Sequence, residues 1–449
     1  MADCPINSAS ETIADFIYRN GSQQQFPGNS EDIPCMDFVS TDFSIIYTPL
    51  DTVEPISLSK FTYYSIPGLY TLLDSSSMDA SGILATHASP ALSNQGRGVI
   101  IGIIDTGIDY TNPLFRNQDG TTRILSIWDQ SLPEDKSLLP AGVPNRYNAS
   151  GASYGTEYTQ EQINEALESD NPFAVVPSTD TNGHGTFLAG IAAGGILPNQ
   201  DFTGAAPECE LVIVKLKPAK QYLRDFYLIS NDADAYQEND IMMGIKYLRV
   251  EAYSQRKPLV ILLGIGSNLG SHEGTSPLNV MIQDISRYLG MATVIAAGNE
   301  TGRGHHYMGS VPIGEESVEV EIRVGNAESQ HGFVVELWAD TADTYSVGFV
   351  SPSGESIGRI PIIGRNETSI PFLLEPTVIT VNYQLIETGA GKQLVFIRFE
   401  APTNGIWRIR VYNTQYLTGQ FNMWLPAHTL ISDETVFLTS SPYTTITLP

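Results

Sequence analysis

Three polar residues of this 449-residue sequence each stand beside glycine at places where catalytic chemistry could occur. Asp105 ends the apolar run GVIIGIID, His184 lies between two glycines in TNGHGTF, and Asn299 follows the apolar run ATVIAAG. A carboxylate can hold an imidazole, an imidazole can move a proton, and an amide can donate to a developing oxyanion. We therefore expect these three side chains to converge on the rim where the strands of one sheet end.

Each residue also has a purely structural interpretation. Asp105 could close an Asx-turn, and Asn299 could end a strand. The glycines beside His184 could form a turn, with residues 180–182 capping the helix that follows. The ordered occurrence of all three residues favours the chemical interpretation.

The elements that would position these residues alternate between strand and helix. The runs GVIIGIIDTG, ELVIVKLK, PLVILLGIG and ATVIAAGN are typical of parallel strands buried on both faces. Helices are expected at 185–194, 239–254 and 277–289, the last capped by Ser276 with Pro277 in its first turn. This alternation predicts an α/β core, a parallel sheet with helices on both faces.

The flanking segments have other patterns. Residues 1–74 predict a small α+β unit that starts with a helix, because Ser8 and Glu11 have capping-box spacing, and continues with strands SIIYTPL and PISLSKFTYYSI. Residues 303–443 show period-two stretches such as VEVEIRV and FVVELWAD, which predict an inserted β-sandwich of jelly-roll type.

Composition restricts the partners. The chain has 24 basic and 50 acidic residues and a formal net charge of −26, which disfavours nucleic acid and anionic membrane surfaces. Its apolar runs are too short to span a bilayer, and the opening MADCPINSAS is unlike a signal peptide, so a cytoplasmic location is expected. Cys4, Cys35 and Cys209 are expected to be reduced thiols.

Five motifs together resemble those of a known family. IGIIDTGIDY, NGHGTFLAGIAAG, GAAPECELVIVKL, LGIGSNLGS and VIAAGNE are similar, in order and spacing, to the motifs of the subtilisin-like serine proteases. The resemblance covers roughly residues 76–302. Within that family, the short N-terminal unit, ILSIWDQ, DIMMGIKYL and the β insertion most resemble the clostridial Csp germination proteases.

The resemblance implies roles for named residues. Asp105 would be the catalytic acid, His184 the general base and Asn299 the oxyanion-hole amide. No metal and no cofactor are implied. The strand LLGIGS would pair with an extended peptide substrate. The residues implied in substrate binding are Gly264, Ile265, Gly266, Ala297 and Gly298.

The resemblance also implies a prodomain. Residues 1–74 would lie in the active-site cleft as a first product, with processing at Asp74 and Ser75. The catalytic core would run over 75–302, and residues 444–449 would begin its return after the insertion. The partners implied are a protein or peptide substrate and this prodomain, and the setting implied is a spore, where a cortex-hydrolase precursor is processed.

The nucleophile of the family is missing from the sequence. Its Gly-Thr-Ser-x-Ala stretch should follow the Asn299 motif, but the chain ends at TTITLP without one. Ser276 in EGTSPLN precedes Asn299 and is interpreted as a helix cap. The chain as given is therefore expected to be inactive, and a pseudoprotease that regulates an active relative is an alternative hypothesis.

Three weaker signals have alternative interpretations. Trp338, Trp407 and Trp424 could form a binding surface on the β insertion, but aromatics in such strands are more often core. His305 and His306 are expected in a solvated loop rather than at a metal. The acidic run EQINEALESD predicts an exposed helix.

Overall fold

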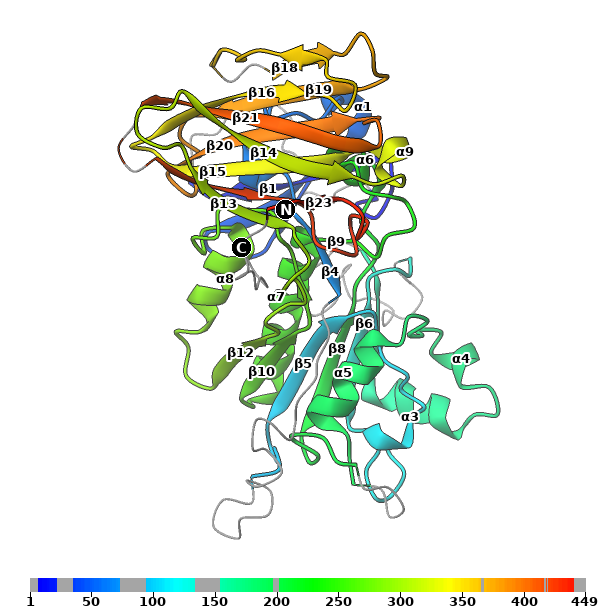
Figure 1. Ribbon diagram of the computed structural model, residues 1–449. Helices are drawn as coiled ribbons and strands as arrows, with labels where there is room; N and C mark the ends of the chain where they lie inside the picture. Colours follow the sequence, from blue (N-terminus) through cyan, green and yellow to red (C-terminus); the bar gives the residue numbers. More distant parts are fainter. Residues whose placement is uncertain are drawn as a thin grey trace.

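The structure of the chain is a computed structural model. It describes residues 7–21, 35–72, 94–133, 154–196, 202–364, 367–415, 417 and 419–439. Figure 1 shows a parallel sheet with its helices at one end and two large antiparallel sheets at the other. The proposed processing site at Asp74 and Ser75, the segment 444–449 and Cys4 lie outside the described residues.

The central sheet has the strand order β12-β10-β5-β8-β6-β7. The first five strands of this order are mutually parallel, and β7 pairs antiparallel with β6 at one edge. The predicted parallel α/β core is confirmed. Its strands are β5 (Ile100–Asp105), β6 (Ile124–Asp129), β7 (Thr156–Thr159), β8 (Glu210–Lys215), β10 (Leu259–Leu263) and β12 (Met291–Ile295).

Helices cover both faces of this sheet. On one face, α7 (Glu238–Gln255) and α8 (Pro277–Ile285) share a hydrophobic core with inward residues of β5, β8 and β10. On the other face, α3 (Gln160–Glu168) and α5 (His184–Ala193) pack on β5, β6 and β8. The shorter helical segments are η2 (Pro113–Phe115), α4 (Pro172–Val175) and α6 (Gln221–Tyr227).

The N-terminal unit, defined here as the described residues from 7 to 72, begins with a strand instead of the predicted helix. Residues 13–19 form β1, which pairs antiparallel with β3 from Ile13↔Pro49 to Arg19↔Phe43. Ile13 and Ile17 enter one hydrophobic cluster, while Ala14 and Phe16 enter another, so both faces of β1 are buried.

The remaining elements of the unit are short. The carboxylate of Glu11, expected in a capping box, instead accepts a hydrogen bond from the backbone of Gln221 at 2.8 Å. The predicted strand SIIYTPL is confirmed as β3, but PISLSKFTYYSI forms only the 3₁₀ turn η1. The elements are β2 (Cys35–Phe38), β3 (Phe43–Pro49), α1 (Leu50–Val53), η1 (Tyr63–Ser65) and β4 (Leu69–Leu72).

Residues 306–437 belong to the segment predicted as a β insertion and are called the inserted β-unit here; they form two antiparallel sheets around one core. The sheet orders are β13-β22-β15-β20-β19-β18 and β17-β16-β21-β14-β23. The core draws apolar side chains from both sheets. The elements are β13 (His306–Ser310), β14 (Ser317–Val324), α9 (Glu328–His331), β15 (Phe333–Asp340), β16 (Thr344–Val350), β17 (Ser356–Ile357), β18 (Glu367–Pro371), β19 (Val378–Gln384), β20 (Lys392–Glu400), β21 (Gly405–Gln415), β22 (Gln420–Trp424) and β23 (Val436–Phe437).

The tryptophans of the insertion do not form a binding surface. Trp338, Trp407 and Trp424 are 2%, 0% and 7% exposed, which contradicts the alternative of an exposed aromatic face. Trp338 and Trp424 join a hydrophobic cluster that contains residues of the N-terminal unit, such as Phe61, and of the core, such as Phe226. The three parts of the chain therefore share one apolar junction.

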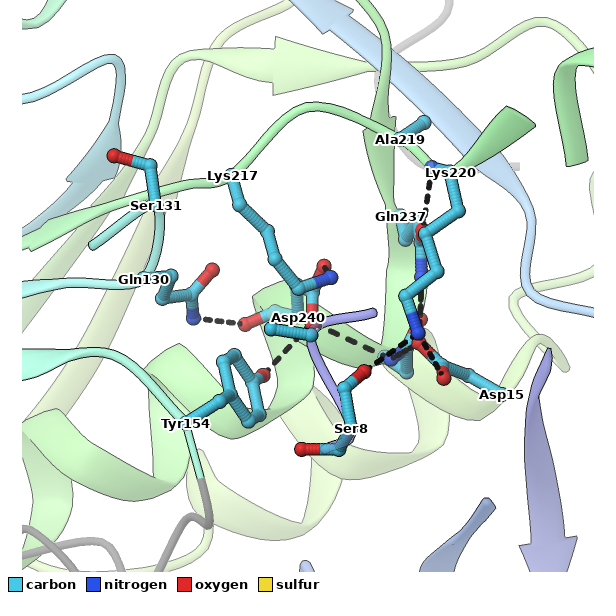
Figure 2. A network of polar contacts seen from close by, with 12 residues as sticks. Ser8, Asp15, Gln130, Ser131, Tyr154, Lys217, Ala219, Lys220, Gln237 and Asp240 are labelled. Atoms are coloured by element: carbon cyan, nitrogen blue, oxygen red, sulfur yellow. Dashed lines mark hydrogen bonds and ion pairs between the residues drawn. The ribbon is translucent and has the colours of Figure 1, made fainter. Parts of the chain in front are cut away.

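A buried polar network fastens the N-terminal unit to the core (Figure 2). Lys220 Nζ lies 2.6 Å from Asp15 Oδ1 and also donates to the carbonyl of Ser8, and both charged side chains are 1% exposed. Gln237 and Asn239 donate to the other oxygen of Asp15. Burial lowers the pKa of Lys220, while the facing carboxylate opposes that shift.

The cysteines differ from the prediction. Cys35, at the start of β2, is disulfide-bonded, so the expectation of three reduced thiols is wrong. Cys209 is a free, buried thiol beside Arg123, and burial raises its pKa to about 11.

Candidate active site

Asp105 and His184 meet where strand β5 ends and helix α5 begins. His184 Nδ1 lies 2.8 Å from Asp105 Oδ1, which also accepts the backbone N–H of Thr106 at 2.7 Å. Asp105 is 1% exposed, whereas the side chain of His184 is 16% exposed. Burial raises the pKa of Asp105, although the bonds from His184 and Thr106 oppose this rise. The arrangement is a buried acid that holds a partly accessible imidazole.

The glycines around His184 allow this approach. A Cβ on Gly185 would lie 2.2 Å from the carbonyl oxygen of Gly107, so a side chain there would push α5 away from β5. Gly183 is the N-cap of α5 and has a φ of 88°, a left-handed conformation that favours glycine.

Asp180 orders the turn that precedes the helix. Its carboxylate accepts the N–H groups of Gly183 at 2.9 Å and Thr186 at 2.8 Å, and also the hydroxyl of Thr106 at 2.8 Å. Burial would raise the pKa of Asp180, but these hydrogen bonds outweigh it and hold the pKa below its usual value. Of the predicted cap candidates, Asp180 thus satisfies the N–H of Thr186 at the start of α5, and Asn182 Oδ1 accepts that of His184 at 3.3 Å.

Gly264 lies directly against the acid–imidazole pair. A Cβ at this position would be 3.4 Å from Asp105 Oδ2, 3.4 Å from His184 Cε1 and 2.2 Å from Leu188 Cδ1. A side chain here would require Leu188 to move. The chain therefore passes beside the pair as it leaves β10.

The next two residues, β11 (Ile265–Gly266), form a ladder with the N-terminal unit. Ile265 pairs with Leu72 and Gly266 with Thr71, so β4 runs antiparallel to β11. On its other edge, β4 pairs with β9 (Tyr236–Gln237), and the order β11-β4-β9 places it between two strands of the core. The strand predicted to bind peptide is thus paired with an extended segment of the chain itself. This segment, β4, ends at Leu72, two residues before Asp74.

The oxyanion candidate lies at the same rim of the sheet. Ala297, Gly298 and Asn299 follow β12, which is separated from β5 by β10. Asn299 is half-buried, whereas the next residue, Glu300, is 2% exposed.

Glu300 is a feature that the sequence reasoning missed. Its carboxylate accepts hydrogen bonds from Asn268 Nδ2 at 2.8 Å, His305 Nδ1 at 2.6 Å and His428 Nδ1 at 2.9 Å. Burial would raise the pKa of Glu300, but these donors outweigh it and hold the pKa well below its usual value. Its place at the end of the VIAAGNE motif was the only signal, because His428 is 128 residues farther along the chain.

The histidine pair is buried, which contradicts the expectation of a solvated loop. His305 is 1% exposed and bonded to Glu300, and His306 Nε2 lies 2.9 Å from Asn422 Oδ1. The ring of Trp424 stacks between His306, at 3.6 Å between centroids, and His272, at 3.9 Å. The aromatic junction between core and insertion keeps these rings out of solvent.

Comparison with known proteins identifies the family of this chain. Residues 96–353 match the sequence profile of the subtilase family, Peptidase S8. This chain belongs to the subtilase family. The Clostridium perfringens CspB protease has a similar solved structure, with a TM-score of 0.67 and 28% identity over 82% of this chain and 69% of that one.

Curated relatives of this subtilase chain include plant and bacterial enzymes. Subtilisin-like protease SBT3.10 of Arabidopsis thaliana is 30% identical over 138 residues, which is 30% of this chain and 18% of that protein. The PII-type proteinase of Lacticaseibacillus paracasei is 23% identical over 266 residues, 59% of this chain and 12% of that protein. The chain thus spans less than a fifth of the length of these relatives.

Ser276 of this subtilase chain is a helix cap. Its hydroxyl accepts the backbone N–H of Asn279 at 3.2 Å, and Pro277 occupies the first turn of α8, as predicted. The acidic run EQINEALESD overlaps helix α3, whose Ile163 and Ala166 are buried.

Neither a metal site nor a membrane span is found in the described part of the subtilase chain. Within those residues, no cluster of three His, Cys, Asp or Glu side chains could hold a metal ion. No helix there is both long and apolar enough to cross a bilayer.

Proposed function

We propose that the natural polypeptide is a serine endopeptidase in which Asp105 and His184 act as the acid–base pair. The observation that carries this proposal is the 2.8 Å contact between Asp105 Oδ1 and His184 Nδ1. The buried carboxylate would keep the proton on Nδ1, and Nε2 would accept the proton of a serine hydroxyl and return it to the leaving amine. Asn299 would donate to the oxyanion as it forms.

The proposed substrate is an extended peptide. The β11-β4-β9 ladder supports this, because its middle strand has the conformation and the pairing that such a substrate needs. Leu72 pairs with Ile265, next to Gly264, and Gly264 lies against His184. β4 therefore ends near the acid–imidazole pair, two residues before Asp74, which supports processing between Asp74 and Ser75 with residues 1–74 acting as a prodomain.

The nucleophile is proposed to lie beyond the printed sequence. No Gly-Thr-Ser-x-Ala stretch follows Asn299 in these 449 residues. We propose that residues after 449 return from the inserted β-unit, for which we retain the jelly-roll assignment, and supply the serine. From the resemblance to the Csp germination proteases, we further propose that the protein processes a spore cortex-hydrolase precursor in a spore-associated, cytoplasmic setting.

Labelling of the full-length natural protein with a serine-directed fluorophosphonate tests the enzymatic proposal. Label should attach to one serine, and His184→Ala should slow labelling by about 100- to 10,000-fold, because general-base catalysis is lost. His331→Ala, a change at an exposed histidine of α9, is the matched control and should label like the unmodified protein. Equal labelling of His184→Ala and the unmodified protein would refute the proposal.

A pseudoprotease is the second candidate. The observation that favours it is β4, whose two edges are already paired, so the peptide-binding strand is occupied by the chain itself. Such a protein would bind a peptide or an active relative without cleavage. Absence of label on a full-length protein whose Gly-Thr-Ser serine is intact would favour this candidate.

A further inference from the structure

One loop of the inserted β-unit reaches the rim of the core. This bridging loop, residues 425–431, lies between β22 and β23. His428 uses both its backbone N–H, at 3.0 Å, and its Nδ1, at 2.9 Å, to contact Glu300 Oε1. Because Glu300 directly follows Asn299 and also binds Asn268, the loop is fixed beside the oxyanion candidate and the segment that follows β11.

The same loop contacts the strand that occupies the peptide position. The hydroxyl of Thr429 forms a hydrogen bond with the hydroxyl of Thr71 in β4. Thr71 is 0% exposed, whereas Thr429 is exposed. Leu430, the next loop residue, belongs to the same hydrophobic cluster as Leu69.

The two faces of β4 meet different parts of the molecule. Successive side chains of a strand point to opposite faces, so Leu69 and Thr71 share one face while Tyr70 and Leu72 share the other. Tyr70 and Leu72 pack with the hydrophobic cluster of the α/β core. The face carrying Leu69 and Thr71 is the one that meets the bridging loop.

We propose that the bridging loop is a substrate-recognition element that selects a small residue with a β-hydroxyl at the peptide position opposite Gly266. This inference rests on the proposed function, since it treats β4 as the model of a bound peptide. Thr71 is 0% exposed, and its hydroxyl is paired with the hydroxyl of Thr429. Threonine or serine therefore fits there, whereas valine lacks the hydroxyl and leucine is too large.

A double-mutant cycle on the 449-residue chain tests the contact without catalysis. Hydrogen exchange of the β4 amides reports how often β4 leaves its neighbours. Thr429→Val should raise this exchange about fivefold, because it leaves the Thr71 hydroxyl buried without a partner. In a Thr71→Val background, Thr429→Val should have no further effect, since no buried hydroxyl remains.

Two variants control the cycle. Thr429→Ser keeps the hydroxyl and should exchange like the unmodified chain. Thr380→Val removes another hydroxyl, one that lies 3.0 Å from Ser369 within the inserted β-unit, and should leave β4 unchanged. An equal effect of Thr429→Val in both backgrounds, including no effect in either, would overturn the inference.

Peptide hydrolysis by the full-length protein separates this inference from the proposed function. With peptides that differ only at the position opposite Gly266, threonine and serine should be preferred about tenfold over valine, and Thr429→Val should remove the preference. Hydrolysis without such a preference overturns the recognition role alone. If the full-length protein hydrolyses no peptide while Thr71 and Thr429 remain coupled in the hydrogen-exchange cycle, the enzymatic function is overturned and a binding role for the loop remains.

Discussion

Gly185 sets how closely helix α5 approaches strand β5, and thereby the distance between His184 and Asp105. The sequence predicted that Asp105 and His184 would lie together, because their motifs are local strings of side chains and glycines. It could not predict the contacts of Glu300, because the partner His428 lies in a segment without a motif, 128 residues farther along the chain. Contacts between distant segments depend on packing that no local pattern encodes.

Gly185→Ala should destabilise the chain by about 1–3 kcal/mol, because its Cβ would lie 2.2 Å from the Gly107 carbonyl oxygen. Gly190→Ala is the matched control in the same helix, where a Cβ would meet nothing within 4 Å. That control should stabilise the chain by about 0.5–1 kcal/mol through reduced backbone entropy. Urea unfolding measures both free energies, and equal values for the two variants would contradict the packing argument.

At the scale of elements, β1 shows where sequence patterns stop being sufficient. The residues 13–19 have helix-like apolar spacing after Ser8 and Glu11, yet they pair with β3 because both faces of the strand find apolar partners. Tertiary burial here outweighs a local capping signal. In contrast, the strands of the parallel sheet were predictable, because an unbroken apolar run fits an element buried on both faces.

Asp15→Asn should weaken the attachment of β1 to the core by about 3–5 kcal/mol, because it leaves the Lys220 ammonium buried without a counter-charge. Urea unfolding, with hydrogen exchange of β1 to localise the change, measures this loss. Arg97→Gln removes an exposed ion pair with Glu208 and should leave unfolding unchanged. A value for Asp15→Asn within error of the unmodified chain would show that this network does not fasten the unit.

At the scale of the whole molecule, three units meet at Glu336 of the inserted β-unit. Its carboxylate accepts the Tyr63 hydroxyl of the N-terminal unit at 2.6 Å and the Gly270 N–H of the core at 2.8 Å. It also accepts the ring N–H of Trp338 at 2.9 Å. The sequence could predict each unit separately, but it could not predict this junction, which joins residues from three distant parts of the chain.

Glu336 should make the stability of the molecule depend on pH. Burial raises its pKa from 4.5 to about 7, although its hydrogen bonds oppose the rise. Because the folded state holds the proton more tightly, this stabilisation is fully present below about pH 4.5 and is lost as the pH rises through 7. Glu336→Gln should therefore reduce the fall in unfolding free energy between pH 5 and 8 by up to about 3 kcal/mol.

Urea unfolding at the two pH values measures this effect. Glu315→Gln, at an exposed site of the same β-unit, is the control and should keep the full pH dependence. Glu238 and Glu251, whose pKa values burial also raises to about 7, should leave a residual dependence in Glu336→Gln. An unchanged pH dependence in Glu336→Gln would exclude Glu336 as the titrating group.

The position of β4 has a kinetic consequence for any foreign peptide. With β11 on one edge of β4 and β9 on the other, the position between these two core strands is already filled, so an arriving segment can take it only by replacing the resident strand. The observed rate of peptide binding would then reach a maximum as the peptide concentration rises. That maximum equals the rate at which β4 leaves its position.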